Sequence, residues 1–144
     1  FKETSTDQIH FALTKGNWTA NEPVLVRVQA SNSYFDVLSR LTTGETPLLE
    51  KVTKMINDEG KGALIFINNV SNSENTMRKL QQFLDFQDGQ EQRPTLASNF
   101  HDYGIGTQIL KNLGINNFRV ITQNVNQKPL VGGYDVEVTE MVQL

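Results

Sequence analysis

The sequence predicts a single α/β domain over residues 1–144, with a mixed sheet flanked by helices. Short apolar or alternating segments, typical of strands, alternate along the chain with segments of helical periodicity. The first two strand segments have no helical segment between them, which argues against a fully parallel, doubly wound sheet. A chain of 144 residues is long enough to bury the core of one domain.

Two strands are expected at the start of the chain. Residues Ile9–Thr14 form an apolar segment that is closed by a turn around Gly16. Residues Val24–Ala30 alternate valines with Leu25, Arg27 and Gln29, which is typical of a second strand.

A helix and a buried strand follow. The helical pattern starts at Pro47, and the glycine turn Gly60-Lys61-Gly62 is expected to end it. The apolar residues that share one face of this helix are Leu48, Val52, Met55 and Ile56. Residues Ala63–Ile67 are a short, continuous apolar run, which predicts a strand buried on both faces.

The second half continues the alternation. Apolar residues recur at helical spacing between Met77 and Leu84, and a polar loop follows. The remaining predicted elements are a helix over Gly104–Leu113, ended by Gly114, and strands over Phe118–Thr122 and Tyr134–Val138.

Composition excludes several classes of partner. A net charge of −3 and a pI near 5.3 give no reason to expect nucleic acid or an anionic membrane as a partner. No apolar run is long enough to span a bilayer. The absence of cysteine excludes disulfides and thiolate metal sites, and it fits a reducing, cytoplasmic location. Because the chain starts at Phe1 without a methionine, we expect it to be cut from a longer protein.

Four segments carry a resemblance to a known family. These are His10–Gly16, Val24–Val28, Leu64–Ile67 and Asp102–Asn124. They resemble the GTP cyclohydrolase II family, whose enzymes open the guanine ring of GTP at the start of riboflavin synthesis. The resemblance covers nearly the whole chain and implies that family's fold, but the matched segments are mainly scaffold: apolar faces, turn glycines and helix ends.

The resemblance also implies a zinc site that this sequence lacks. Family members hold zinc with three cysteines, and Asn32 stands at the first of these positions. The family's other two zinc cysteines form a spaced pair that falls near Leu41–Thr43, and this sequence has no thiol there. Asparagine, serine and threonine cannot replace three thiolates around a catalytic zinc. We therefore expect no zinc and no other cofactor.

The other catalytic positions of the family are also changed. Asn99 stands where the family has its proton acceptor, and an amide has no useful basicity near neutral pH. His101 stands where the family has a reactive arginine. No catalytic residue is therefore predicted. His101-Asp102 as half of a catalytic or metal site is less favoured than a surface or capping role. The family's nucleotide-binding loop after the central strand has no arginine or glycine here, over Asn68–Asn75.

A few polar positions keep the residues with which the family contacts its nucleotide. Arg27 and Thr122 match, whereas Gln127 stands at the family's lysine position, with Lys128 next to it. A surface salt bridge is an equal interpretation of Arg27. The Gly104-Ile-Gly106 segment resembles an anion site at a helix start, but it lacks the full dinucleotide pattern, and close helix packing is the preferred interpretation.

The leading hypothesis is a catalytically degenerate GTP cyclohydrolase II-like domain. By resemblance, such domains follow a 3,4-dihydroxy-2-butanone 4-phosphate synthase domain, so the expected partners are this fused upstream lyase and a second subunit in a homodimer. The domain would have a structural or regulatory role for the lyase. The alternative is a sensor that binds a nucleotide, if weakly, or a flavin-pathway ligand, through Arg27, Thr122 and Lys128. An active cyclohydrolase with a rebuilt site is the least supported reading.

Overall fold

A computed structural model describes residues 1–5, 7–30, 48–68, 81, 100–123, 125 and 135–144, with the backbone alone at 30 and 100–103. The described residues form a five-stranded sheet of order β1-β3-β2-β4-β5. The strands are β1 (Phe11–Lys15), β2 (Val24–Ala30), β3 (Gly62–Ile67), β4 (Asn117–Thr122) and β5 (Glu137–Gln143), and the helices are α2 (Leu48–Glu59) and α4 (Phe100–Asn112). β1 is antiparallel to β3, and the other neighbours are parallel, so the predicted mixed sheet is confirmed.

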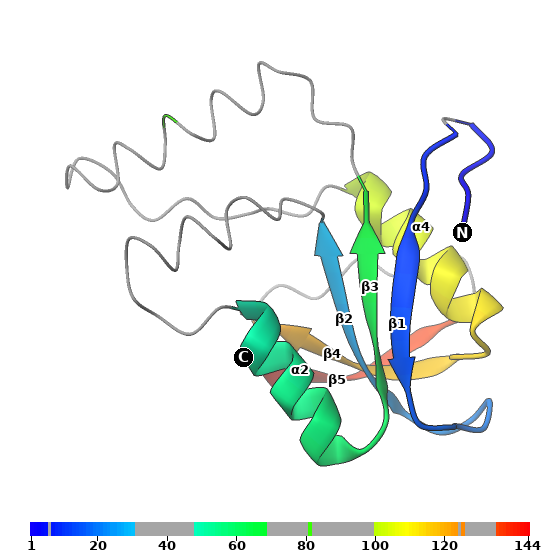
Figure 1. The fold of residues 1–144 in the computed structure, drawn as a ribbon. Helices are drawn as coiled ribbons and strands as arrows, with labels where there is room; N and C mark the ends of the chain where they lie inside the picture. The colour runs from blue at the N-terminus through cyan, green and yellow to red at the C-terminus, as the bar shows by residue number, and fades with distance from the viewer. Residues whose placement is uncertain (6, 31–47, 69–80, 82–99, 124, 126–134) are drawn as a thin grey trace.

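The helices lie on opposite faces of the sheet, with α2 in front and α4 behind in the view of Figure 1. α2 follows β2 along the chain, and α4 follows β3. In the sheet β2 lies between β3 and β4, so the chain moves to one side of β2 and then crosses to the other. This arrangement brings the carboxyl ends of β2, β3 and β4 to one edge of the sheet, where ligands of α/β folds commonly bind.

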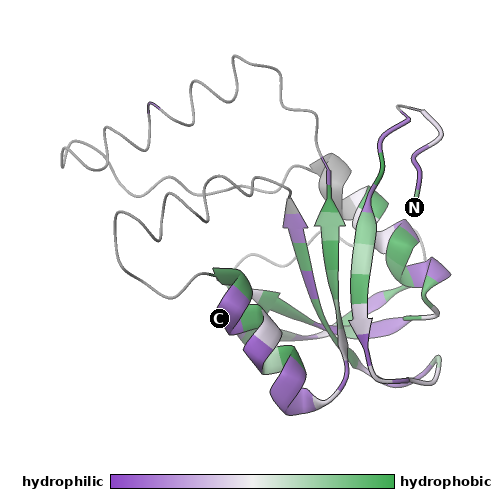
Figure 2. Ribbon diagram, viewed as in Figure 1, coloured by the Kyte–Doolittle hydropathy of each residue, from purple (hydrophilic) through white to green (hydrophobic). Residues whose placement is uncertain are grey.

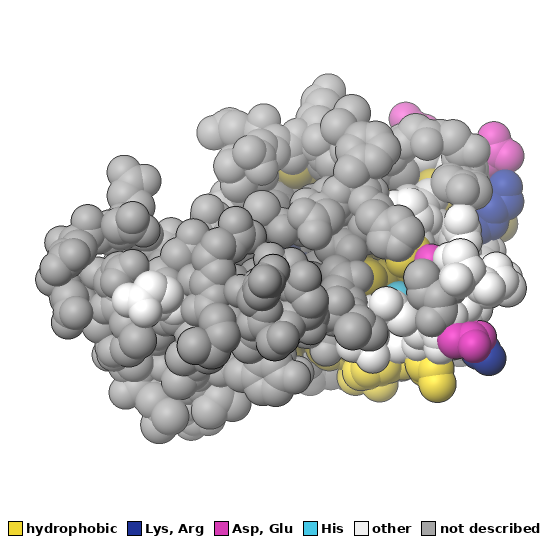
Figure 3. Space-filling model, turned by 90° about the horizontal axis from the view of Figure 1, so that it is seen from above, with side chains coloured by type: hydrophobic (Ala, Val, Ile, Leu, Met, Phe, Trp, Pro, Cys, Tyr) yellow, Lys and Arg dark blue, Asp and Glu magenta, His cyan; other side chains and the backbone are white. Residues whose placement is uncertain are grey.

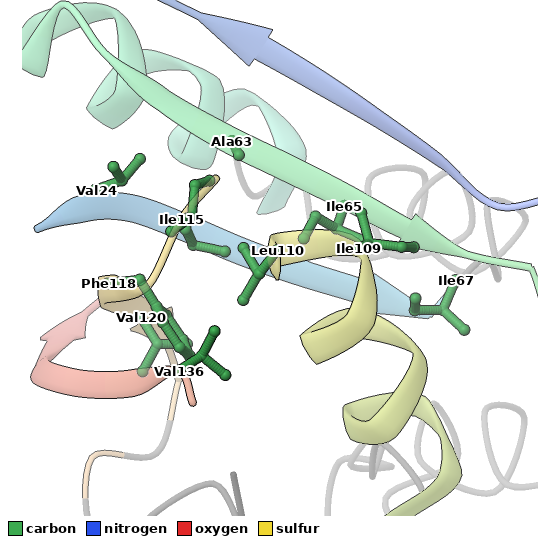
Figure 4. Close-up of a cluster of buried hydrophobic side chains, with 11 residues drawn as sticks. Val24, Ala63, Ile65, Ile67, Ile109, Leu110, Ile115, Phe118, Val120 and Val136 are labelled. Atoms are coloured by element: carbon green, nitrogen blue, oxygen red, sulfur yellow. The ribbon is translucent and has the colours of Figure 1, made fainter. Parts of the chain in front are cut away.

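The larger core cluster lies between the sheet and α4 (Figure 4). β3 contributes Ala63, Ile65 and Ile67 to it, and α4 contributes Ile109 and Leu110. The strands are rich in valine and isoleucine, whose branched side chains pack well on a pleated surface. The other members are Val24, Val26, Ile115, Phe118, Val120 and Val136.

A smaller cluster lies under α2 on the other face. Val52 and Ile56 of α2 pack there on Leu25, Leu64 and Ile121 of the sheet. The predicted apolar face of this helix is thus confirmed, and Gly60 ends the helix as expected, with a positive φ of 81°. Because Leu25 and Leu64 face α2 while their chain neighbours face α4, β2 and β3 are buried on both faces, as predicted for β3.

The last strand differs from its prediction. β5 runs over Glu137–Gln143, not over Tyr134–Val138. The chain turns just before the strand, because Asp135 has a positive φ of 51°. Met141 and Val142 pack on the two clusters and hold the later residues against β4.

α4 also differs from its prediction, because it begins at Phe100 and not at Gly104. Glycine is a weak helix former, but packing on the sheet overrides that preference, and α4 continues through Gly104 and Gly106. A Cβ placed at Gly106 would lie 3.4 and 3.5 Å from the methyl groups of Val28. These are ordinary van der Waals distances, so Gly106 lies packed against β2. Because α4 begins at Phe100, the Gly104-Ile-Gly106 segment is not at the helix start, and the alternative of an anion site there is wrong. The predicted helix between Met77 and Leu84 lies outside the described residues, apart from Gln81, which is helical.

Candidate functional site

The candidate site lies where β2 and β4 separate at their carboxyl ends. The two strands pair only from Val24 to Val26 and from Phe118 to Val120. Beyond this point β2 continues along β3 as far as Ala30, and β4 continues along β5 as far as Thr122. A split of this kind is the topological switch point of an open α/β sheet.

The side chain of Arg27 bridges this split. Its Nη1 donates a hydrogen bond to the carbonyl oxygen of Ile121 at 2.9 Å. Its Nε and Nη2 donate to Oε1 of Gln29 at 3.3 and 3.1 Å, and Gln29 itself is buried. Arg27 thus supplies a hydrogen-bond donor to β4 beyond the point where the backbone pairing of β2 with β4 has ended. The two hydrogen bonds to Gln29 fix the orientation of the guanidinium plane.

Replacement of Arg27 by alanine is expected to lower the free energy of unfolding by about 1–3 kcal/mol, because the Ile121 carbonyl loses its donor in a partly buried place. Urea unfolding followed by the fluorescence of the single tryptophan measures this loss. Arg119→Ala is the matched control, with an expected loss of about 1 kcal/mol or less, since its ion pairs are more exposed. A loss from Arg27→Ala no larger than that of the control would contradict the bridging role.

Thr122 lies next to this bridge, at the last position of β4. Val120 belongs to the cluster under α4 and Ile121 to the cluster under α2, so Thr122 alternates to the α4 side of the sheet. Leu25 packs under α2, and Arg27, two residues further along β2, therefore also lies on the α2 side of the sheet. The structure thus brings Arg27 and Thr122 to the same switch point but on opposite faces.

The remaining predicted positions are described only in part or not at all. Asn32, Asn99 and Lys128 lie outside the described residues. His101 lies in the first turn of α4, where the backbone alone is described. The helix therefore begins ahead of the position matched to the reactive arginine of the family.

His10 was not singled out from the sequence, yet it lies buried at the same edge of the sheet, 1% exposed. Its Nδ1 accepts a hydrogen bond at 3.0 Å from the backbone N–H of Asn68, the first residue after β3. A neutral imidazole that accepts at Nδ1 carries its proton on Nε2, which lies 3.7 Å from a carboxylate oxygen of Glu3. Figure 3 looks onto this end of the molecule and shows histidine in cyan beside hydrophobic and acidic side chains.

Two further groups of charged side chains lie away from the switch point. Arg119 of β4 contacts Glu140 of β5 at 2.6 Å and Glu59 of α2 at 2.8 Å. The hydrogen bond to Glu140 has the largest effect in raising the pKa of the Arg119 guanidinium, and Glu59 raises it further. At the amino ends of β2 and β3, Lys61 pairs with Glu22, and this bond lowers the pKa of the Glu22 carboxyl. The first group ties β4 to β5 and α2, and the second joins the segment before β2 to the turn between α2 and β3.

The donor groups do not fit the zinc that the resemblance implies. A zinc site of that kind needs thiolates, and the sequence contains no cysteine. Within the described ranges no group of three or more His, Asp or Glu residues is placed to hold a metal ion. The switch point instead offers the guanidinium of Arg27 and the carboxamide of Gln29 on the α2 side of the sheet, and the hydroxyl of Thr122 on the α4 side. A guanidinium and a carboxamide are groups that can hold an anion or a polar ligand.

A family model described as GTP cyclohydrolase II matches residues 1–143. The chain belongs to the GTP cyclohydrolase II family. The mixed sheet with helices on both faces is consistent with this assignment, and the resemblance seen in the sequence is confirmed. None of the helices in the described part of the chain is long and apolar enough to cross a membrane.

Relatives in riboflavin biosynthesis match the same residues. The riboflavin biosynthesis protein RibBA of Cytophaga hutchinsonii is 34% identical over all of this chain, which spans 37% of that protein. The RibBA proteins of Bacillus mycoides and Parabacteroides distasonis are 34% and 29% identical over 94% and 100% of the chain. The chain thus spans 35–37% of the length of these curated relatives.

Proposed function

We propose that this chain is a catalytically degenerate GTP cyclohydrolase II-like domain with a structural or regulatory role in a riboflavin-biosynthesis protein. The observation that carries the proposal is the absence of cysteine from all 144 residues. The family reaction, as the resemblance implies it, depends on a thiolate-bound zinc that activates water, and neither an amide nor a hydroxyl side chain supplies that ligand field.

The contacts at the candidate site support the same proposal. The guanidinium of Arg27 is engaged with Ile121 and Gln29, where it joins two strands. The imidazole of His10 is buried, and its Nδ1 is occupied by the Asn68 backbone. These described groups hold the carboxyl edge of the sheet together, which is a scaffold role.

The partner that we propose is a 3,4-dihydroxy-2-butanone 4-phosphate synthase domain in the same polypeptide. The test compares the lyase activity and the mass in solution of the parent protein with those of a form that ends before Phe1. We expect removal of the domain to lower the activity of the lyase, its thermal stability or its oligomeric state. Equal values of all three for both forms would remove the structural and regulatory proposal.

A second candidate function is a sensor of a nucleotide or flavin-pathway ligand. It is favoured by one observation: Arg27 and Thr122, matched to nucleotide contacts of the family, both lie at the topological switch point of the sheet, although on opposite faces. A ligand there would compete with Gln29 and Ile121 for the guanidinium.

Calorimetric titration with GTP distinguishes the two functions. A sensor is expected to bind with a dissociation constant of about 1 mM or tighter, equivalent to about −4 kcal/mol. Arg27→Ala and Lys128→Ala should weaken that binding, whereas Lys51→Ala on the exposed side of α2 should not. If titration with GTP and with pathway intermediates gives only the heat of dilution, the chain binds none of them. That result would exclude the sensor and leave the scaffold function.

A further inference from the structure

The side chain of His10 continues the link between β1 and β3 beyond the end of their backbone pairing. The last pair of that ladder is Phe11 with Phe66. The backbone of His10 pairs instead with that of Phe1, at 2.8 and 2.9 Å. The N–H of Asn68, the first residue after β3, donates to Nδ1 of His10 at 3.0 Å. The chain that leaves β3 is thus held to β1 by a side chain that can gain a proton.

The imidazole is buried next to one carboxylate. His10 is 1% exposed, and it shares the α4 side of the sheet with Ala12, two residues further along the chain. Its Nε2 has no hydrogen-bond partner among the described residues and lies 3.7 Å from a carboxylate oxygen of Glu3. In Figure 2 the segment before β1, which supplies Glu3, is largely hydrophilic, whereas β1 and β3 are largely hydrophobic.

The other charged groups of the described elements around the imidazole are engaged elsewhere. In the segment before β1, Lys2 and Asp7 pair with each other at 2.8 Å and are largely exposed. The amino group of Phe1 donates to the backbone carbonyl of the histidine, not to its ring. β3 contains no charged residue, and among the described side chains of α4 the first charge is Lys111, in the last turn. In this part of the structure, Glu3 is therefore the charge that meets a proton on the ring.

We propose that His10 is a proton-operated latch, which holds the backbone of Asn68 when the ring is neutral and releases it when the ring is protonated. In the neutral ring that accepts at Nδ1, Nε2 carries the proton. A second proton binds at Nδ1, and two N–H groups then face each other across 3.0 Å. That contact has to open, because neither group has an acceptor there. The charged ring keeps a partner in the Glu3 carboxylate, beside Nε2.

The latch acts at a defined place in the chain. Asn68 is the first residue of Asn68–Asn75, the segment that the resemblance matches to the nucleotide-binding loop of the family. Histidine is the side chain whose charge ordinarily changes between about pH 5 and 8, so the two states are reached without unfolding the sheet. The inference goes beyond the proposed function, since it needs neither a ligand nor a lyase domain.

Amide hydrogen exchange followed by nuclear magnetic resonance tests the latch between about pH 8 and about pH 5. The measured quantity is the protection factor of the Asn68 amide, its exchange rate relative to an unstructured peptide at the same pH. We expect it to fall at least about ten-fold as the ring nitrogens of His10, observed in the same sample, take up a proton. The amide of Ile65, in the middle of β3, is the internal reference, and its unchanged protection would show that the sheet stays folded.

His10→Asn is the matched control. The Oδ1 of asparagine can accept from Asn68 in the place of Nδ1, and it does not titrate, so the protection of Asn68 should stay constant over the same range. His101 is present in both proteins, so an effect of its titration would persist in the control.

Three results would overturn the proposal. The first is a protection factor of Asn68 that does not change with pH in the unmodified chain. The second is a loss that persists in His10→Asn or that Ile65 shares. The third is a neutral ring that carries its proton on Nδ1 at about pH 8, because such a ring cannot accept from Asn68.

Discussion

Replacement of Ile65 by alanine is expected to lower the free energy of unfolding by about 3–4 kcal/mol, a large part of the roughly 5–15 kcal/mol that holds a domain folded. Ile65 is 0% exposed and lies on β3 opposite Ala12 of β1 and Val28 of β2. Its truncation leaves a cavity between sheet and helix that the surrounding strands cannot close, because they are fixed by their ladders.

Urea unfolding, followed by tryptophan fluorescence and circular dichroism, measures this loss. The matched control is Ile9→Ala, since Ile9 is 63% exposed; it should cost about 0.5 kcal/mol or less. Similar losses from both variants would mean that β3 is not at the centre of the core.

Replacement of Gly62 by alanine is the second change with a large expected effect, about 2–3 kcal/mol of lost stability. An added Cβ would lie 2.7 Å from the carbonyl oxygen of Leu25 and 3.1 Å from two side-chain carbons of Ile56. The first contact is with the backbone of a central strand, which cannot move without a shift of the sheet. The strand would have to separate from β2 or from α2.

Gly104→Ala is the matched control, because both changes add one methyl group to a glycine. Among the described residues nothing lies within 4 Å of an added Cβ at Gly104, which is inside α4. Alanine favours a helix over glycine by up to about 1 kcal/mol, so this variant should be neutral or more stable. Thermal unfolding of both variants decides the matter, and a stable Gly62→Ala protein would contradict the close packing at the start of β3.

The fold could be predicted from the sequence where one apolar pattern had one interpretation. The continuous run Ala63–Ile67 and the amphipathic pattern of α2 were of this kind, and both elements were found with bounds close to those predicted. The predictions failed at α4 and β5, because their bounds depend on contacts between distant parts of the chain. Gly106 stays helical because it packs on Val28 of β2, and β5 is fixed by its pairing with β4.

The candidate site was less predictable than the fold. Arg27 and Thr122 were selected by resemblance, and the structure places both at the switch point, on opposite faces of the sheet. No local pattern indicates that Arg27 donates to a carbonyl 94 residues away, or that His10 accepts from a backbone N–H 58 residues away. Such contacts arise from the order of strands in the sheet. Asn32, Asn99 and Lys128 lie outside the described residues, so their roles remain predictions.

The catalytic state of this domain is tested most directly by measuring zinc content and GTP turnover on the same purified sample, after dialysis against zinc. A chain with no thiolate is expected to keep far less than one zinc per molecule and to leave GTP unchanged, while a zinc-containing member of the family assayed beside it converts GTP. Stoichiometric zinc, together with GTP turnover that a chelator abolishes, would contradict catalytic degeneracy.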